Sequence, residues 1–212
     1  MGKKVDAHDG LDFKQGPSIQ RGDKAMVEQR QVAVVTSLGK KYSGLVDIPN
    51  ESFRTTDLFN SANIYWKNPN EKCFENAILM RNVRLMFDET SVYRKYDKIQ
   101  VRLDEIFYFY DDHPGISDER ERMRASTMVQ MSREKLQRVN IITVLVSNSF
   151  YDIAGDFYGL FKKKSNDRFL PLTNVSMIEI SRKDGKWFKK EIALPHKFIC
   201  VSNQHVESAL IN

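Results

Sequence analysis

The chain has 212 residues, of which 41% are hydrophobic and 29% are charged, and its formal net charge is +5. This length fits one large or two small domains, and the composition can support a packed core. No apolar run approaches the roughly 18 residues that span a bilayer, so we expect no membrane insertion. No secretory leader is evident, so we expect a cytoplasmic protein, and the small positive charge permits an acidic partner without requiring one.

The first 30 residues show no sustained hydrophobic periodicity. Gly10, Gly16, Pro17 and Gly22 interrupt them, and charges of both signs are mixed in. This pattern predicts a flexible N-terminal arm over residues 1–30.

Residues 31–112 read as a first small β-barrel domain. Gly44 lies in the middle of a β-rich stretch, which indicates a bulge or a tight bend. Thr55 or Thr56 can cap a single helical turn that ends at Asn60. The strands that we expect cover residues 31–36, 42–48, 63–67, 76–86 and 98–110.

A connecting helix is expected over residues 113–138. Ser117 is a suitable N-cap, two acidic residues follow it in the first turn, and the helix should run to about Gln137. Its apolar stripe is thin, so we expect it to pack along one side only.

Residues 139–212 read as a second small β-barrel domain. The expected strands cover residues 139–147, 150–161, 168–182, 187–194 and 198–201. A turn at Lys183-Asp-Gly-Lys186 is typical of a tight hairpin. Pro171 lies inside the third stretch, where it indicates an edge or a kink.

Two pairs of residues suggest that the domains are copies of each other. Asn82 and Asn174 are 92 residues apart, and so are His113 and His205. On this spacing, residues 107–113 would correspond to residues 199–205. We therefore expect His113 and His205 to share a structural role, and Asn82 and Asn174 likewise.

Short motifs in both halves resemble an uncharacterised family of small bacterial domains. Ser43-Gly-Leu-Val46 and Arg54-Thr-Thr-Asp-Leu-Phe-Asn60 are similar to the head of its pattern. Phe169-Leu-Pro-Leu-Thr-Asn-Val175 and Phe198-Ile-Cys-Val-Ser-Asn-Gln-His-Val206 are similar to its tail. The resemblance implies a mainly β fold of two tandem small antiparallel barrels, Sm-like in type, joined by one central helix. It implies no activity.

The sequence offers no catalytic or cofactor-binding constellation. None of the four histidines lies at metal-ligand spacing, and no nucleophile elbow or phosphate-binding loop is present. The Arg54/Asp57 pair is better read as structural, with Asp57 holding the helical turn that Asn60 ends. Cys73 and Cys200 are expected to be buried thiols. We therefore expect no enzyme and no cofactor.

Two binding functions remain open. The first is a scaffold subunit that associates with another protein or with its own copies through sheet edges and the arm. The second is binding of RNA or single-stranded nucleic acid through Lys162, Lys163, Lys164 and Arg168, which lie near several aromatic residues. Residues 139–212 contain ten Lys or Arg and seven Asp or Glu, and this weak excess favours the scaffold.

Overall fold

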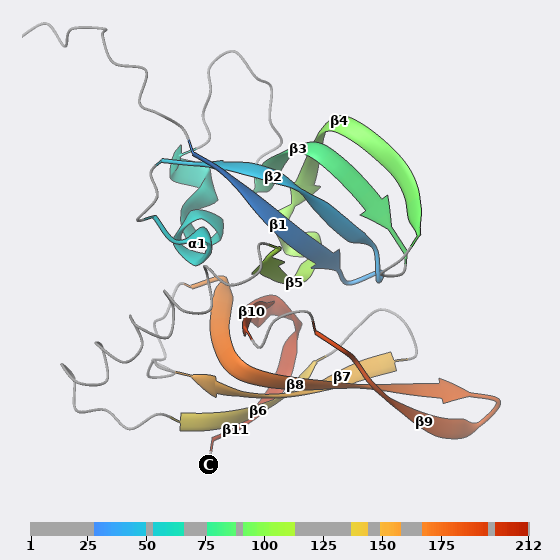
Figure 1. Cartoon of the computed structure of the whole chain (residues 1–212). Helices are drawn as coiled ribbons and strands as arrows, with labels where there is room; N and C mark the ends of the chain where they lie inside the picture. Colours follow the sequence, from blue (N-terminus) through green and yellow to red (C-terminus); the bar gives the residue numbers. More distant parts are fainter. Residues whose placement is uncertain are drawn as a thin grey trace, which may run out of the picture.

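The computed structural model describes residues 28–49, 53–65, 76–87, 91–112, 137–143, 149–157, 167–194 and 198–211. Within them the chain is mainly β, as predicted, and all eleven strands belong to one antiparallel sheet (Figure 1). The strands are β1 (Glu28–Thr36), β2 (Lys41–Ile48), β3 (Ala77–Met86), β4 (Val92–Arg102), β5 (Ile106–Asp111), β6 (Gln137–Thr143), β7 (Ser149–Phe157), β8 (Phe169–Lys183), β9 (Lys186–Glu191), β10 (Phe198–Ser202) and β11 (Val206–Ile211). The helix is α1 (Thr55–Tyr65), and the short 3-10 helices are η1 (Leu103–Glu105) and η2 (Asn203–His205).

The two halves of the sheet have the same connectivity. In the first half, β1 to β4 form a meander, and β5 follows η1 and returns to pair with β1. In the second half, β6, β7 and β8 form the same meander, and the fourth strand is split into β9 and β10. After η2, β11 returns to pair with β6. We call β1–β5 repeat one and β6–β11 repeat two.

The correspondence between the repeats extends to strand register. Val32 lies opposite Gly44 in repeat one, and Val139 lies opposite Gly155 in repeat two. The β3–β4 ladder agrees in register with the β8–β10 ladder, and the β1–β5 ladder agrees with the β6–β11 ladder, including a register shift at the same place. Independent strands would not share these details, so the two halves are copies of one structural unit.

A close approach between neighbouring strands recurs in both repeats. Asn82 in β3 and Asn174 in β8 both have positive φ, 48° and 49°, a conformation that asparagine tolerates better than most residues. Gly44 faces the first of these bends, and a Cβ on it would lie 2.9 Å from the Arg81 carbonyl oxygen. Gly155 faces the second bend in the same way, with somewhat more room. The bend expected at Gly44 is therefore a contact between a glycine and a kinked neighbouring strand.

The prediction of two closed barrels is wrong. Strand β10 pairs with β8 on one side and with β5 on the other, so the repeats merge into a single open sheet. Two closed barrels would require the fourth and fifth strands of each repeat to pair only with strands of that same repeat. Here β5 instead uses its free edge to bind the other repeat, and β4 and β11 end the sheet.

Three local predictions also need correction. Asn63–Tyr65 are the last residues of α1 and do not form a strand. The single strand expected over residues 98–110 is interrupted by η1, and Gln137 and Arg138 begin β6 rather than end a helix. The flexible arm, apart from residues 28–30 in β1, and the connecting helix up to residue 136 lie outside the described residues. The tight hairpin turn is confirmed, with Asp184 and Gly185 both at positive φ.

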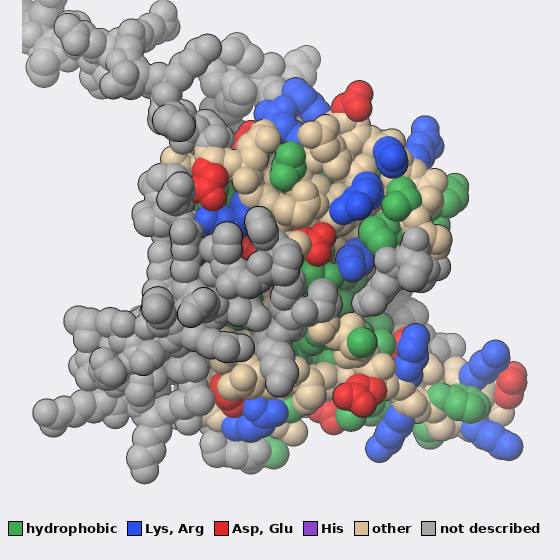
Figure 2. All heavy atoms as spheres, in the orientation of Figure 1, with side chains coloured by type: hydrophobic (Ala, Val, Ile, Leu, Met, Phe, Trp, Pro, Cys, Tyr) green, Lys and Arg blue, Asp and Glu red, His purple; other side chains and the backbone are tan. Residues whose placement is uncertain are grey.

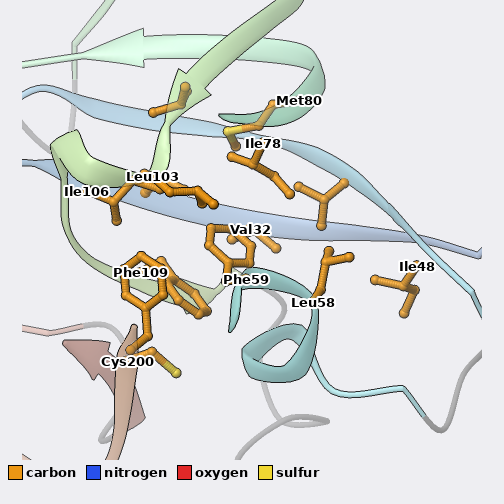
Figure 3. Close-up of a cluster of buried hydrophobic side chains, with 14 of the residues drawn as sticks. Val32, Ile48, Leu58, Phe59, Ile78, Met80, Leu103, Ile106, Phe109 and Cys200 are labelled. Carbon is orange, nitrogen blue, oxygen red and sulfur yellow. The ribbon is translucent and has the colours of Figure 1, made fainter. Parts of the chain in front are cut away.

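Two groups of buried side chains form the core. One lies mainly within repeat one but includes Phe169, Phe198 and Cys200 of repeat two. The other lies mainly within repeat two but includes Ala33 and β5 side chains of repeat one. Figure 3 shows Cys200 of β10 beside Phe109 of β5 and Phe59 of α1. The core is therefore continuous with the junction between the repeats.

Candidate interaction site

The junction between the repeats is an antiparallel pairing of β5 with β10. Cys200 lies opposite Phe109, and Val201 lies opposite Tyr108. Every residue of β5 and β10 is buried, because each strand has a neighbouring strand on both edges and side chains packed on both faces. The molecule thus contains one complete example of strand pairing between a fourth strand and a fifth strand.

Helix α1 of repeat one packs against this junction and forms hydrogen bonds to repeat two. The Phe59 ring stacks on Phe109 at 3.9 Å between centroids, and Phe169 of repeat two meets both rings edge-on. The Asn60 side chain accepts a hydrogen bond from the Phe169 N–H at 2.8 Å and donates one to the Phe169 carbonyl at 3.3 Å. This side chain acts as a substitute strand partner for the first residue of β8.

The Arg54/Asp57 pair stabilises the start of the same helix. Arg54 Nε donates to Asp57 Oδ2 at 2.7 Å, and a second hydrogen bond makes the pair bidentate. Both side chains are about one-third exposed or more, and Asp57 lies in the first helical turn, where negative charge is favourable. The pair thus positions the helix that carries Asn60 and Phe59.

His205 lies at a second contact between the repeats. Its ring meets Phe107 edge-on, and its Nε2 atom is buried without a hydrogen-bond partner among the described residues. Burial lowers the pKa of His205, while a hydrogen bond to the backbone of Asp104 and the negative charge of Glu105 oppose that effect. An uncharged His205 is therefore the form that fits this contact.

The two end strands of the sheet are β4 and β11. Among the described residues, β4 pairs only with β3 and β11 pairs only with β6. Residues 92–95 of β4 are exposed, and residues 207–210 of β11 are exposed, with Leu210 at 61%. Sheet edges of this kind offer free backbone N–H and C=O groups to another strand.

The hairpin formed by β8 and β9 is a further exposed feature, and it projects from repeat two (Figure 1). Trp187 and Phe188 are 59% and 50% exposed, and Arg182 lies over the Trp187 ring. Figure 2 shows Lys and Arg side chains gathered along this projection, with hydrophobic side chains between them. Its exposed basic residues are Arg182, Lys183, Lys186, Lys189 and Lys190.

The predicted site residues separate into several places. Lys162, Lys163, Lys164 and His113 lie outside the described residues. Arg168 is half-buried, and its carbonyl accepts a hydrogen bond from the Asn203 N–H at the start of η2. This hydrogen bond ties the chain before β8 to η2 within repeat two.

The asparagine pair and the histidine pair have different outcomes. Asn82 and Asn174 occupy equivalent bends, and Asn174 also donates to Asp156 Oδ2 at 2.6 Å. The equivalence of His113 and His205 is wrong, because His205 in η2 corresponds to Glu105 in η1. Segments 107–111 and 199–202 are strands that pair with each other and do not correspond.

Sequence reasoning expected exposed sheet edges and a hairpin turn at residues 183–186, but it did not identify β4 and β11 as the end strands or the β8–β9 hairpin as an exposed basic feature. An available signal was the contrast between the uninterrupted apolar run Ile106–Tyr110, typical of a strand buried on both faces, and the polar Glu207-Ser208 of β11. The pair Trp187-Phe188, with lysines on both sides in the sequence, was a second signal.

No group of His, Cys, Asp and Glu suited to a metal ion occurs in the part of the chain that the structure describes. In the same part, no helix is both long and apolar enough to cross a membrane. Asp112 accepts a hydrogen bond from Ser43 Oγ at 2.7 Å, and this contact links the end of β5 to β2. Cys200 is buried and contacts Thr56. These polar groups therefore have structural partners.

No protein-family model, curated protein or solved structure matches the chain.

Proposed function

We propose that the protein is a non-catalytic binding or scaffold subunit that associates with other protein chains through the edges of its sheet. The observation that carries this proposal is that β4 and β11, among the described residues, each have a neighbouring strand on one edge only, in a sheet that already joins its two repeats by strand pairing. Backbone pairing supplies affinity, and the side chains along the edge supply specificity.

The polar groups described above support a role without catalysis. The best-organised of them, at Asn60, Arg54 and Asp156, hold elements of the fold together. A scaffold needs this rigidity, because an edge strand is a precise template only when the strands behind it are fixed.

The test compares two leucines of equal exposure. Leu210 is on the open edge of β11 at 61% exposure, and Leu38 is in the β1–β2 turn at 60% exposure. Leu210→Lys should abolish protein association measured by native mass spectrometry, whereas Leu38→Lys should not. The association of the unaltered chain should persist from low to moderate salt. A bare monomer in both conditions, with no protein partner, would contradict the proposal.

A second candidate function is binding of RNA or single-stranded nucleic acid. The β8–β9 hairpin favours it, because an exposed Trp187 lies among five basic side chains. Phosphates would contact the lysines and a base would stack on the indole. Binding of a single-stranded oligonucleotide should then quench Trp187 fluorescence in a Trp66→Phe background and weaken steeply with salt. Quenching that survives moderate salt, or none at all, would exclude this mode.

The contact predicted from the sequence at Lys162, Lys163 and Lys164 can be separated from the hairpin in the same assay. Replacing these three lysines by Ala tests the predicted contact, and replacing Lys189 and Lys190 by Glu tests the hairpin. The Sm-like resemblance of each repeat stays a prediction. The return of the fifth strand beside the first, in both repeats, supports it.

A further inference from the structure

The β8–β9 hairpin holds most of the net positive charge of the chain in one short stretch. Residues 182–190 contain five basic residues and one acidic residue, an excess of four in a chain whose formal net charge is +5. All five basic side chains are exposed: Arg182, Lys183, Lys186, Lys189 and Lys190. Positive charge gathered in one place attracts a negatively charged partner more strongly than the same charge spread over the surface.

The end of this hairpin extends beyond the neighbouring strand. Within the described residues, β7 pairs with β8 only as far as Ser181, whereas β8 and β9 continue their pairing to Lys183 and Lys186. Figure 1 shows the resulting projection, and Figure 2 shows the basic side chains along it. The hairpin can therefore contact a partner that the rest of repeat two does not touch.

Both faces of the hairpin carry an exposed aromatic side chain. Trp187 and Phe188 are consecutive residues of β9, so their side chains point to opposite faces, and they are 59% and 50% exposed. Lys189 shares the face of Trp187, and Lys190 shares the face of Phe188, because side chains two residues apart lie on the same side of a strand. Each face thus combines an aromatic ring with basic residues.

We propose that this hairpin binds the surface of a lipid bilayer that contains anionic phospholipids. A bilayer interface surrounds a projecting hairpin, so it contacts the rings on both faces at once, whereas an extended nucleic acid or peptide lies along one face. Aromatic rings are favourable at the level of the headgroups, and long lysine side chains reach the phosphates. The contact needs no segment that crosses the bilayer. It goes beyond the proposed function, because the hairpin is separate from the end strands β4 and β11.

The surroundings of Trp187 favour a place at the interface over base stacking. The Arg182 guanidinium lies over the indole at 5.8 Å from the ring centroid, and Phe150 meets the ring in a T-shaped contact at 5.9 Å. Base stacking requires an open ring face, and Arg182 covers one of the two. These contacts hold the indole in place while more than half of its surface stays exposed, which suits a ring with one apolar and one polar part.

The counterpart hairpin in repeat one shows that aromatic exposure alone does not make the site. The β3–β4 hairpin also exposes two aromatic side chains, Phe87 at 58% and Tyr93 at 67%. Residues 87–95, however, contain two basic and two acidic residues, so their net charge is zero. Only the hairpin of repeat two combines exposed rings with a basic excess, and we expect lipid binding there.

The first test uses the fluorescence of Trp187 in a Trp66→Phe variant of the full chain, where Trp187 is the remaining tryptophan. Vesicles of phosphatidylcholine with about one-third phosphatidylserine should shift its emission to the blue, because the indole leaves water, and vesicles of phosphatidylcholine alone should not. Sedimentation of the unaltered chain with the same vesicles makes the comparison without a substitution. Equal binding to both kinds of vesicle, or binding to neither, would overturn the proposal.

The second test removes charge from one hairpin at a time. Lys189→Gln with Lys190→Gln should lower the partition coefficient about 20- to 30-fold, since each basic residue at an anionic surface contributes about fivefold. The matched control is Arg94→Gln with Lys95→Gln on the β3–β4 hairpin, where both residues are exposed and the same charge is lost. The control should change the coefficient less than about threefold, because charges away from the surface are screened. Equal losses would show that net charge acts without the hairpin and would overturn the proposal.

The third test asks whether both faces of the hairpin contact the lipid. Phe188→Ser should lower the partition coefficient about three- to tenfold, because the exposed half of the ring no longer leaves water. Tyr93→Ser is the control, since Tyr93 is an even more exposed ring on the other hairpin. Circular dichroism will verify folding in every variant. An unchanged coefficient for Phe188→Ser would overturn the contact through both faces.

The nucleic-acid candidate makes a different prediction at the same hairpin. A single-stranded oligonucleotide that quenches Trp187, in a chain that binds no vesicles, would overturn the lipid proposal and support that candidate. Vesicle binding that is lost in the Lys189/Lys190 variant and kept in Leu210→Lys would support a lipid site separate from the edge of β11.

Discussion

Strands β5 and β11 occupy the same position in the two repeats, yet their surroundings are opposite. Each returns after a 3-10 turn to pair with the first strand of its repeat. Strand β5 is buried along its whole length, with β10 paired on one edge and its side chains in both core groups, whereas residues 207–210 of β11 are exposed. Two strands at equivalent positions can thus differ completely in burial, and the buried one is the apolar strand that has a neighbour on both edges.

The largest expected effect comes from making β5 resemble β11. Phe109→Ala introduces at the filled junction the residue that β11 carries at the equivalent position, and it removes a ring that contacts Phe59 and Phe169. We expect a loss of about 3–5 kcal/mol in the free energy of unfolding, measured by urea denaturation. The reverse change, Ala209→Phe, should cost little. Similar losses from both would contradict the comparison.

The second-largest expected effect is a difference in stability between alanine substitutions at Gly44 and at Gly155. A Cβ at Gly44 would lie 2.9 Å from a backbone oxygen, which cannot move aside, while at Gly155 the nearest atom is the Leu172 Cβ at 3.1 Å. Gly44→Ala should therefore destabilise by about 2–3 kcal/mol and Gly155→Ala by about 1 kcal/mol. Thermal unfolding of the two variants side by side will measure the difference. A larger loss at Gly155 would reverse the assignment of which contact is tighter.

The third-largest expected effect tests the hydrogen bonds between Asn60 of repeat one and Phe169 of repeat two. Asn60→Ala removes both hydrogen bonds to Phe169 and leaves a backbone N–H without its partner. The expected loss is about 1–3 kcal/mol. The control is Asn82→Ala. Asn82 is an exposed residue at a bend within repeat one, so this change is confined to one repeat. Hydrogen exchange should show faster opening at β8 and β10 in the Asn60 variant alone.

The smallest effect is on pH dependence. The pKa of His205 is lowered by burial in the folded state, so the unfolded chain binds more protons at mildly acidic pH. The free energy of unfolding should accordingly fall as the pH drops below the ordinary histidine pKa of about 6.5. His205→Gln, which has no titrating ring, should flatten this part of the profile. An unchanged pH profile in the His205→Gln variant would exclude His205 as the cause.

Much of the local structure was readable from the sequence. The turn at Asp184-Gly185 followed from residues that accept positive φ, and most strands followed from alternating or continuous apolar stretches. The repeat was visible at Asn82 and Asn174, because a kinked strand needs a particular residue there. The helix end was misread because the capping signals at Thr55 and Asn60 gave no evidence that the helix continues to Tyr65.

The sequence by itself determined the mainly β fold, the duplication and the special backbone positions, since these depend on side chains that act locally. Only the tertiary structure decided which strand edges are filled. Every strand offers the same backbone N–H and C=O groups, so the apolar run Ile106–Tyr110 can indicate a strand buried on both faces but cannot identify β10 as its partner. The single spacing of 92 residues failed for His205 for a related reason: insertions between strands change the spacing from element to element, while strand register preserves the correspondence.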